Sequence, residues 1–106
     1  LVLPVMPIET PALSRVDAGS PDFAPRTLYA LSAYTRFANY LGLPALALPT
    51  GFDGSGMPVG LQLVARPGAD GALLDVGTAF QRDSKWHRPV PPGVSGRPLP
   101  SKETAA

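Results

Sequence analysis

The sequence predicts an α/β domain in which helices cover both faces of a sheet. Two apolar segments, residues 45–49 and 59–65, flank a glycine-rich turn. Neither face of these segments is polar enough to meet water, which is typical of strands inside a covered sheet. Before and after this pair, residues 28–41 and 70–83 repeat apolar side chains at spacings of three and four, as amphipathic helices do.

The first third of the chain predicts a strand, a loop and a helix. Residues 1–3 are apolar and β-favouring, and prolines follow them directly, so we expect a short buried strand. From there to Pro25, proline, serine, aspartate and glycine predict a long loop. Thr27 is expected to cap a helix over residues 28–41, and Gly42 stands where a helix ends in the left-handed conformation. The apolar stripe of this helix would be Leu28, Leu31, Thr35, Ala38 and Leu41.

The second half predicts a hairpin followed by a helix. Residues 53–56, Asp-Gly-Ser-Gly, supply the backbone freedom that a reversal between the strands 45–49 and 59–65 needs. Asp70 is expected to cap a helix that runs to about Asp83. The buried stripe of this helix would be Leu73, Val76, Gly77 and Phe80.

Composition limits the classes of function. The 106 residues allow one small domain, which we place at residues 1–92, followed by a Pro/Gly/Ser-rich tail at 93–106. Charged residues are 16% of the chain against roughly 25% in typical domains, which suits a segment covered in part by other protein. A net charge of +1 without a basic run argues against nucleic acid. No apolar run is long enough to span a bilayer. The sequence starts in an apolar stretch without a charged region before it, so we expect no signal peptide. We therefore expect a cytoplasmic protein without membrane contact.

No self-sufficient active site is visible in the sequence. The nearest approaches to G-x-S-x-G are residues 53–56 and 93–96, and neither fits. One histidine, His87, and no cysteine make a metal site or another cofactor unexpected, and His87 suits a surface or packing role. Gln62 is the one polar group in an apolar strand. Its amide either bonds to loop backbone or points into a cavity.

An ordered motif runs from Thr35 to Gln62 and resembles the C-terminal part of amidase-signature enzymes. That family shows T-x-P/F-x-N-x-x-G-x-P-A-x-x-x-P-x-G, then a turn, then G-x-P-x-G-x-Q. The matching residues here are Thr35, Phe37, Asn39, Gly42, Pro44, Ala45, Pro49, Gly51, Gly56, Pro58, Gly60 and Gln62. The opening LVLPVMPIETPAL also looks like a strand and loop of the family, so the resemblance covers about residues 1–92.

The resemblance implies a C-terminal fragment of an α/β/α amidase-signature fold with a mixed central sheet. Enzymes of this family hydrolyse carboxamides through an acyl-enzyme, with a Ser–cis-Ser–Lys triad that lies upstream of the matching region. The chain would therefore hold no catalytic residue and would be inactive alone. Its expected partners are the N-terminal part of the same amidase and a small-molecule amide, and a homodimer is left open.

By position in the family, five residues are expected to line the substrate pocket. Val5, Met6 and Pro7 would do so from the loop after the first strand, and Ser32 and Thr35 from the motif helix. In glutamine-using tRNA amidotransferase subunits, the position matching Ser32 is an aspartate that holds the substrate's ammonium. Serine lacks that charge, which favours a general amidase with an apolar acyl or amine pocket.

Two alternatives stay open from the sequence alone. One is a non-catalytic truncated domain that binds a partner over its exposed sheet, because no nucleophile–base pair is visible and apolar strands lack cover. The other is an A-type subunit of a glutamine-dependent tRNA amidotransferase, within the same family.

Overall fold

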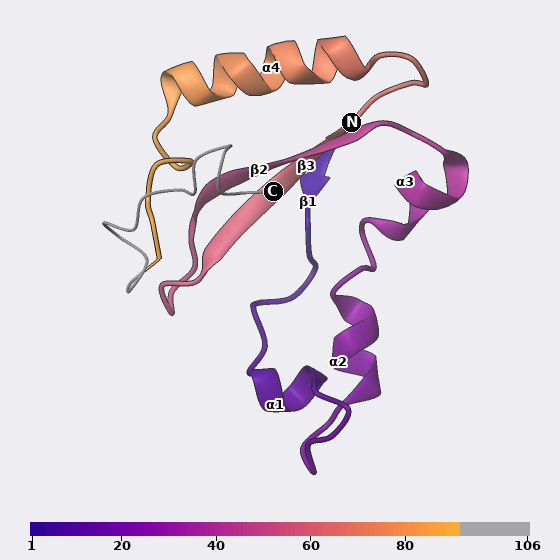
Figure 1. The fold of residues 1–106 in the computed structure, drawn as a ribbon, viewed down its shortest axis with the longest axis vertical. Helices are drawn as coiled ribbons and strands as arrows, with labels where there is room; N and C mark the ends of the chain where they lie inside the picture. The colour runs from indigo at the N-terminus through magenta and orange to yellow at the C-terminus, as the bar shows by residue number, and fades with distance from the viewer. Residues whose placement is uncertain (92–106) are drawn as a thin grey trace, which may run out of the picture.

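The computed structural model describes residues 1–91, in which short helices and a small sheet alternate along the chain (Figure 1). Helix α4 lies along one side of the sheet, and the three shorter helices lie away from it toward the other side. The elements in chain order are β1 (Val2–Pro4), α1 (Leu13–Val16), α2 (Pro25–Ala30), α3 (Arg36–Leu41), β2 (Ala45–Phe52), β3 (Pro58–Val64) and α4 (Asp70–Asp83).

The three described strands form one antiparallel sheet in the order β1-β3-β2. In its register, Leu63 of the central strand β3 pairs with Val2 on one side and with Leu46 on the other. The hairpin β2–β3 and the α/β class are confirmed. Asp53 closes the hairpin, because its Oδ1 accepts hydrogen bonds from the backbone N–H groups of Ser55 and Met57 at 2.8 and 2.9 Å.

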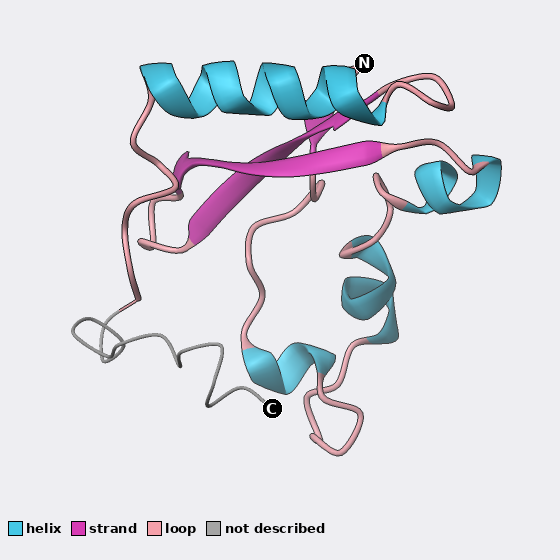
Figure 2. Cartoon of the chain, turned by 45° about the horizontal axis from the view of Figure 1, so that its top comes forward, coloured by secondary structure: helices cyan, strands magenta, loops and turns pink. Residues whose placement is uncertain are grey.

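Helix α4 covers one face of the sheet and makes the core (Figure 2). Leu73 packs there against Leu48 and Leu63, and the half-buried side chains around these three are Leu46, Leu61, Ala65 and Phe80. The prediction that Val76 is buried is wrong, because its side chain is 53% exposed. The core cluster under α4 contains Leu73 and Phe80 of the predicted stripe but not Val76.

Gly77 sets how closely α4 approaches the sheet. A Cβ atom at this position would lie 2.6 Å from Cδ2 of Leu46, so only a glycine fits without movement of that side chain. Gly71, in the first turn of the same helix, has no atom within 4 Å of a built Cβ. The two glycines therefore form a matched pair for substitution.

We expect Gly77→Leu to lower the free energy of unfolding by about 1–3 kcal/mol, because overpacking at the helix–sheet contact displaces Leu46. Gly71→Leu should raise it by about 0.5–1 kcal/mol, because leucine loses less backbone entropy than glycine in a helix and meets open space at this position. Denaturant unfolding of the complete protein measures both. A Gly77→Leu protein as stable as the wild type would show that α4 does not pack this closely.

The prediction of one helix over residues 28–41 is wrong, because the chain forms α2 and α3 with a turn at 31–35 between them. In the turn the backbone N–H groups of Ser32, Ala33 and Thr35 donate to carbonyls three residues back rather than four. The hydroxyls of Ser32 and Thr35 also donate to backbone carbonyls three residues back, at 3.4 and 3.3 Å. Such local bonds compete with helical ones and explain the break.

The ends of these helices follow different signals. Thr27 lies inside α2 and is not its cap, because the helix begins at Pro25, where the fixed φ of proline suits the first turn. Gly42 ends α3 as predicted, with φ at 66°. The N–H groups of Leu43 and Gly42 donate to the carbonyls of Ala38 and Asn39, which is the Schellman arrangement.

Three further expectations concern the loop before Pro25, the start of α4 and the C-terminal tail. The loop up to Pro25 contains the single-turn helix α1, which the sequence did not predict. Asp70 is the first residue of α4 and not its cap, which is Ala69, although the range of the helix is as predicted. The tail assigned to 93–106 lies outside the described residues, and the domain boundary at 92 stays a prediction.

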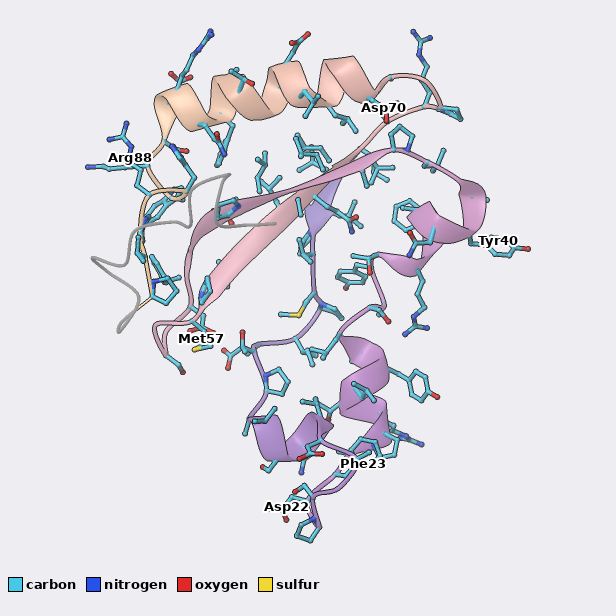
Figure 3. The ribbon with its side chains drawn as sticks, in the orientation of Figure 1. Asp22, Phe23, Tyr40, Met57, Asp70 and Arg88 are labelled. Atoms are coloured by element: carbon cyan, nitrogen blue, oxygen red, sulfur yellow. The ribbon has the colours of Figure 1, made fainter. Side chains whose placement is uncertain are left out.

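The described part of the chain exposes more large apolar side chains than it buries. Only five hydrophobic residues within 1–91 are buried: Ala38, Leu48, Leu63, Val64 and Leu73. Sixteen large hydrophobic side chains in the same range are exposed, among them Leu1 at 75%, Leu74 at 61% and Tyr40 at 90%. Figure 3 shows Tyr40 pointing away from α3. Large exposed apolar patches are typical of interaction surfaces in proteins.

Candidate functional site

A groove of about 600 Å³ lies where the chain leaves β1 and crosses the hairpin. Ala47, Pro49 and Gly60 face away from α4, because they alternate along their strands with the core residues Leu48 and Leu61. The groove is lined by Pro4, Val5, Met6, Ile8, Ala47, Leu48, Pro49, Pro58, Val59 and Gly60. None of these side chains carries a charge, an N–H or an O–H group, and the Met6 thioether is only a weak acceptor, so the groove suits an apolar ligand group.

Val5 and Gly60 meet within this groove. The backbone N–H of Val5 donates to the Gly60 carbonyl at 3.2 Å, which extends the pairing of β1 with β3 past Pro4. A Cβ atom on Gly60 would lie 3.0 Å from the Leu48 carbonyl oxygen and 3.5 Å from Cγ2 of Val5. Gly60 therefore allows β2, β3 and the chain after β1 to approach closely, and any side chain there would take space from the groove.

The structure separates the five predicted pocket residues into two groups. Val5 and Met6 are half-buried and line the groove, whereas Pro7 is exposed and does not line it. Ser32 and Thr35 are half-buried in the turn between α2 and α3, and they do not line the groove either. Their roles toward a substrate stay predictions.

The Ser32 hydroxyl is engaged within its own turn. It donates to the Tyr29 carbonyl at 3.4 Å and accepts from Nε of Arg36 at 3.0 Å. Nη2 of Arg36 donates to the same Tyr29 carbonyl. A guanidinium thus lies beside Ser32, so this position offers no negative charge to a cationic ligand.

Gln62 connects this turn to the sheet. Its side chain is 3% exposed, and its Nε2 donates to the Tyr34 carbonyl. This contact confirms the expectation that the Gln62 amide bonds to loop backbone, which was one of its two interpretations. His87 is exposed after α4, as a surface residue would be.

Sequence reasoning missed most of the groove. Ile8, Pro49, Pro58 and Val59 come from three separate segments, which the antiparallel pairing of β3 with both β1 and β2 brings together. The pairing of β1 with β3 joins residues about sixty positions apart, and no local pattern signals it. The family motif, which includes Pro49, Pro58 and Gly60, was the available signal, and a glycine inside a strand often marks a close approach of backbone.

A second contact that the sequence did not signal joins β2 to the chain after α4. The rings of Phe52 and Trp86 pack edge to face with centroids 6.5 Å apart, and Trp86 also covers Gly51. Across residues 1–91 no three histidine, aspartate or glutamate side chains gather where they could hold a metal ion. No helix in that range has the length and apolar character to cross a membrane.

Comparison with known proteins identifies the family. The model of the Amidase family matches residues 1–74, which is more than half of the chain. The chain belongs to the amidase family. The resemblance seen in the motif from Thr35 to Gln62 is thereby confirmed, and so is the assignment of the α/β elements to an amidase-signature domain.

Several curated relatives of this amidase-family chain are named as the A-type subunit of glutamyl-tRNA(Gln) amidotransferase. The relative from Rippkaea orientalis is 39% identical over 75 residues, which are 71% of this chain and 16% of the relative. The one from Desulforudis audaxviator is 40% identical over 68% of this chain and 14% of the relative. The one from Neisseria meningitidis is 44% identical over 62% of this chain and 14% of the relative. The chain therefore spans about one sixth of these relatives or less.

Proposed function

We propose that residues 1–91 form one wall of the active site of an amide hydrolase whose catalytic groups lie in a longer chain. The groove carries this proposal, because it is concave, apolar and built around a sequence motif of the amidase family. The small share of each relative that the chain covers supports a longer protein. The serine and lysine groups that the family resemblance implies would come from outside these 106 residues.

The rest of that longer chain is the proposed partner of the exposed apolar side chains. Leu1, Val2 and Leu74 are each more than 60% exposed, and the first two lie at the outer strand β1. Further strands and helices of an α/β/α amidase domain would cover these residues and extend the antiparallel sheet into a mixed one. We assign this assembly to the cytoplasm and leave open a homodimer of the complete chain.

The proposed substrate is a small carboxamide with an apolar acyl or amine group. The groove has no charged side chain to orient an ammonium or a carboxylate. Val5 and Met6 would contact the apolar group, and the turn holding Ser32 and Thr35 would lie beside it. An ammonium near Ser32 would also meet the Arg36 guanidinium, which makes a cationic substrate unfavourable there.

A second candidate function is that of an A-type amidotransferase subunit that takes ammonia from glutamine. The names of the curated relatives favour it. The two candidate functions differ in the charge of the substrate. Glutamine carries an ammonium and a carboxylate, and each needs an oppositely charged or hydrogen-bonding group in the site. The apolar groove and the uncharged Ser32 favour the amidase.

Hydrolysis of two substrates by the complete protein separates these functions. We expect an uncharged amide with an apolar chain of several carbons to have a kcat/KM at least about tenfold above that of glutamine, because charged groups lose solvation in the groove. A serine-directed inhibitor should abolish the activity. Preferred glutamine hydrolysis would favour the amidotransferase function, and failure to hydrolyse any simple amide would contradict the enzymatic function.

A further inference from the structure

Among the described residues, Gln62 is the one polar residue that is as buried as the core side chains. It lies at the middle of β3, where it pairs with Leu3 of β1 and with Ala47 of β2. Its neighbours across the sheet are therefore apolar, and its amide reaches instead to the Tyr34 carbonyl. A buried amide with one specific backbone partner fixes the position of that partner.

The partner of Gln62 belongs to a segment that has few other ties to the sheet. Within residues 1–91, no other side-chain hydrogen bond joins the strands to the segment that contains α2, the turn at 31–35 and α3. The turn is also not held by regular helical bonds, since its N–H groups donate to carbonyls three residues back. Ala38 of α3 is buried by packing, and the hydrogen bond from Gln62 is the side-chain bond that ties the turn to the strands.

The same contact places the turn beside the groove. Gly60, which lines the groove, lies two residues before Gln62 on β3, so both face the side of the sheet away from α4. Two residues along a strand span roughly 6–7 Å. Figure 1 shows the connection between α2 and α3 passing next to the chain that leaves β1. The groove and the turn are therefore adjacent on one face.

We propose that Gln62 is a positioning residue that holds the turn at 31–35 next to the groove, where the turn, which does not itself line the groove, would form a second wall around a bound amide. Through Tyr34 it would set the distance of Ser32 and Thr35 from a bound amide, and so the size of the group that fits. The assignment of a bound amide rests on the proposed function, whereas the positioning of the turn does not.

Two substitutions in the complete protein test this role. Gln62→Met keeps the length of the side chain and removes the donor. Gln62→Glu keeps the shape, and its carboxyl can donate to the Tyr34 carbonyl only when it is protonated. Burial raises the pKa of such a carboxyl, so the bond is present at low pH and is lost as the pH rises through that pKa. Thr78→Val is the matched control, because it removes a side-chain bond to the Leu74 carbonyl on α4, away from the groove.

We expect the backbone amides of Ser32, Ala33 and Thr35 to exchange hydrogen at least about tenfold faster in Gln62→Met than in the wild type at the same pH. KM for an apolar amide should rise about tenfold with kcat changed less than about threefold, because the wall and not the reacting groups has moved. In Gln62→Glu both effects, compared with the wild type at the same pH, should be small at low pH and should grow as the pH rises through the raised pKa of the introduced carboxyl. Thr78→Val should show neither.

Three results would overturn the proposal. Unchanged exchange at 32–35 in Gln62→Met would show that Gln62 does not hold the turn. Faster exchange with unchanged KM would show that the turn is not a wall of the site. Equal effects in Gln62→Met and Thr78→Val would show that Gln62 contributes only to the general stability of the protein. If the wild type hydrolyses no amide while exchange responds as expected, the positioning role holds and the proposed function fails.

Discussion

Leu63→Ala is expected to lower the free energy of unfolding by about 2–5 kcal/mol, the usual range for removing a buried leucine from a packed core. Leu63 is 8% exposed at the centre of the sheet, where it pairs with Val2 and Leu46 and packs under Leu73 of α4. The substitution therefore leaves a cavity that borders two strands and the covering helix. Denaturant unfolding of the complete protein, followed by circular dichroism, measures the change.

Asp75→Ala is the matched control for this substitution. Asp75 lies on the exposed side of α4, and alanine favours a helix, so the free energy of unfolding should change by no more than about 0.5 kcal/mol. A Leu63→Ala protein that loses less than about 1 kcal/mol would contradict the packing of α4 on the sheet.

Gly60→Ala is expected to change which amides the complete protein accepts. The added methyl group would lie 3.0 Å from the Leu48 carbonyl oxygen and 3.5 Å from Val5, so it narrows the groove at its closest contact. For an amide with a bulky apolar group, kcat/KM should fall roughly 10–200-fold, the range that one methylene group is worth in an apolar pocket. For a small amide, such as one with two carbons, kcat/KM should fall much less. Steady-state kinetics with a series of chain lengths measures this difference.

Gly54→Ala is the control for Gly60→Ala. Gly54 lies in the hairpin turn, where a built Cβ meets no atom within 4 Å, so all amides should be hydrolysed as by the wild type. If Gly60→Ala lowered kcat/KM equally for small and bulky amides, the groove would not be the place where the substrate's apolar group binds.

Local chemistry predicted the hairpin and α4 well. Asp53 and the glycines after it specify a reversal by their own hydrogen bonds and backbone freedom, and the apolar spacing from Leu73 to Phe80 specifies one covered face. The exposed Val76 shows the limit of that reasoning. A periodic pattern marks the side chains that some neighbour covers, and it does not say whether that neighbour lies within the same 91 residues.

The break at 31–35 and the groove could not be predicted in the same way. Ser32 and Thr35 fit a helical pattern by spacing, yet their hydroxyls bond to nearby carbonyls and replace helical bonds. The groove needs the pairing of β1 with β3 across most of the chain, which the sequence does not signal locally. The family resemblance put Val5 and Met6 in the predicted pocket by position, which periodicity cannot do, and both line the groove, while their contact with a substrate stays a prediction.

We have proposed that these residues form one wall of an active site that a longer amidase-family chain completes. The most direct test is the intact mass, under denaturing conditions, of the protein purified from its native source. We predict a single covalent species several times heavier than 11.0 kDa, because the chain spans 14–16% of the relatives compared. A lone species of 11.0 kDa would contradict the claim and would favour instead a truncated domain that binds a partner over its exposed apolar surface.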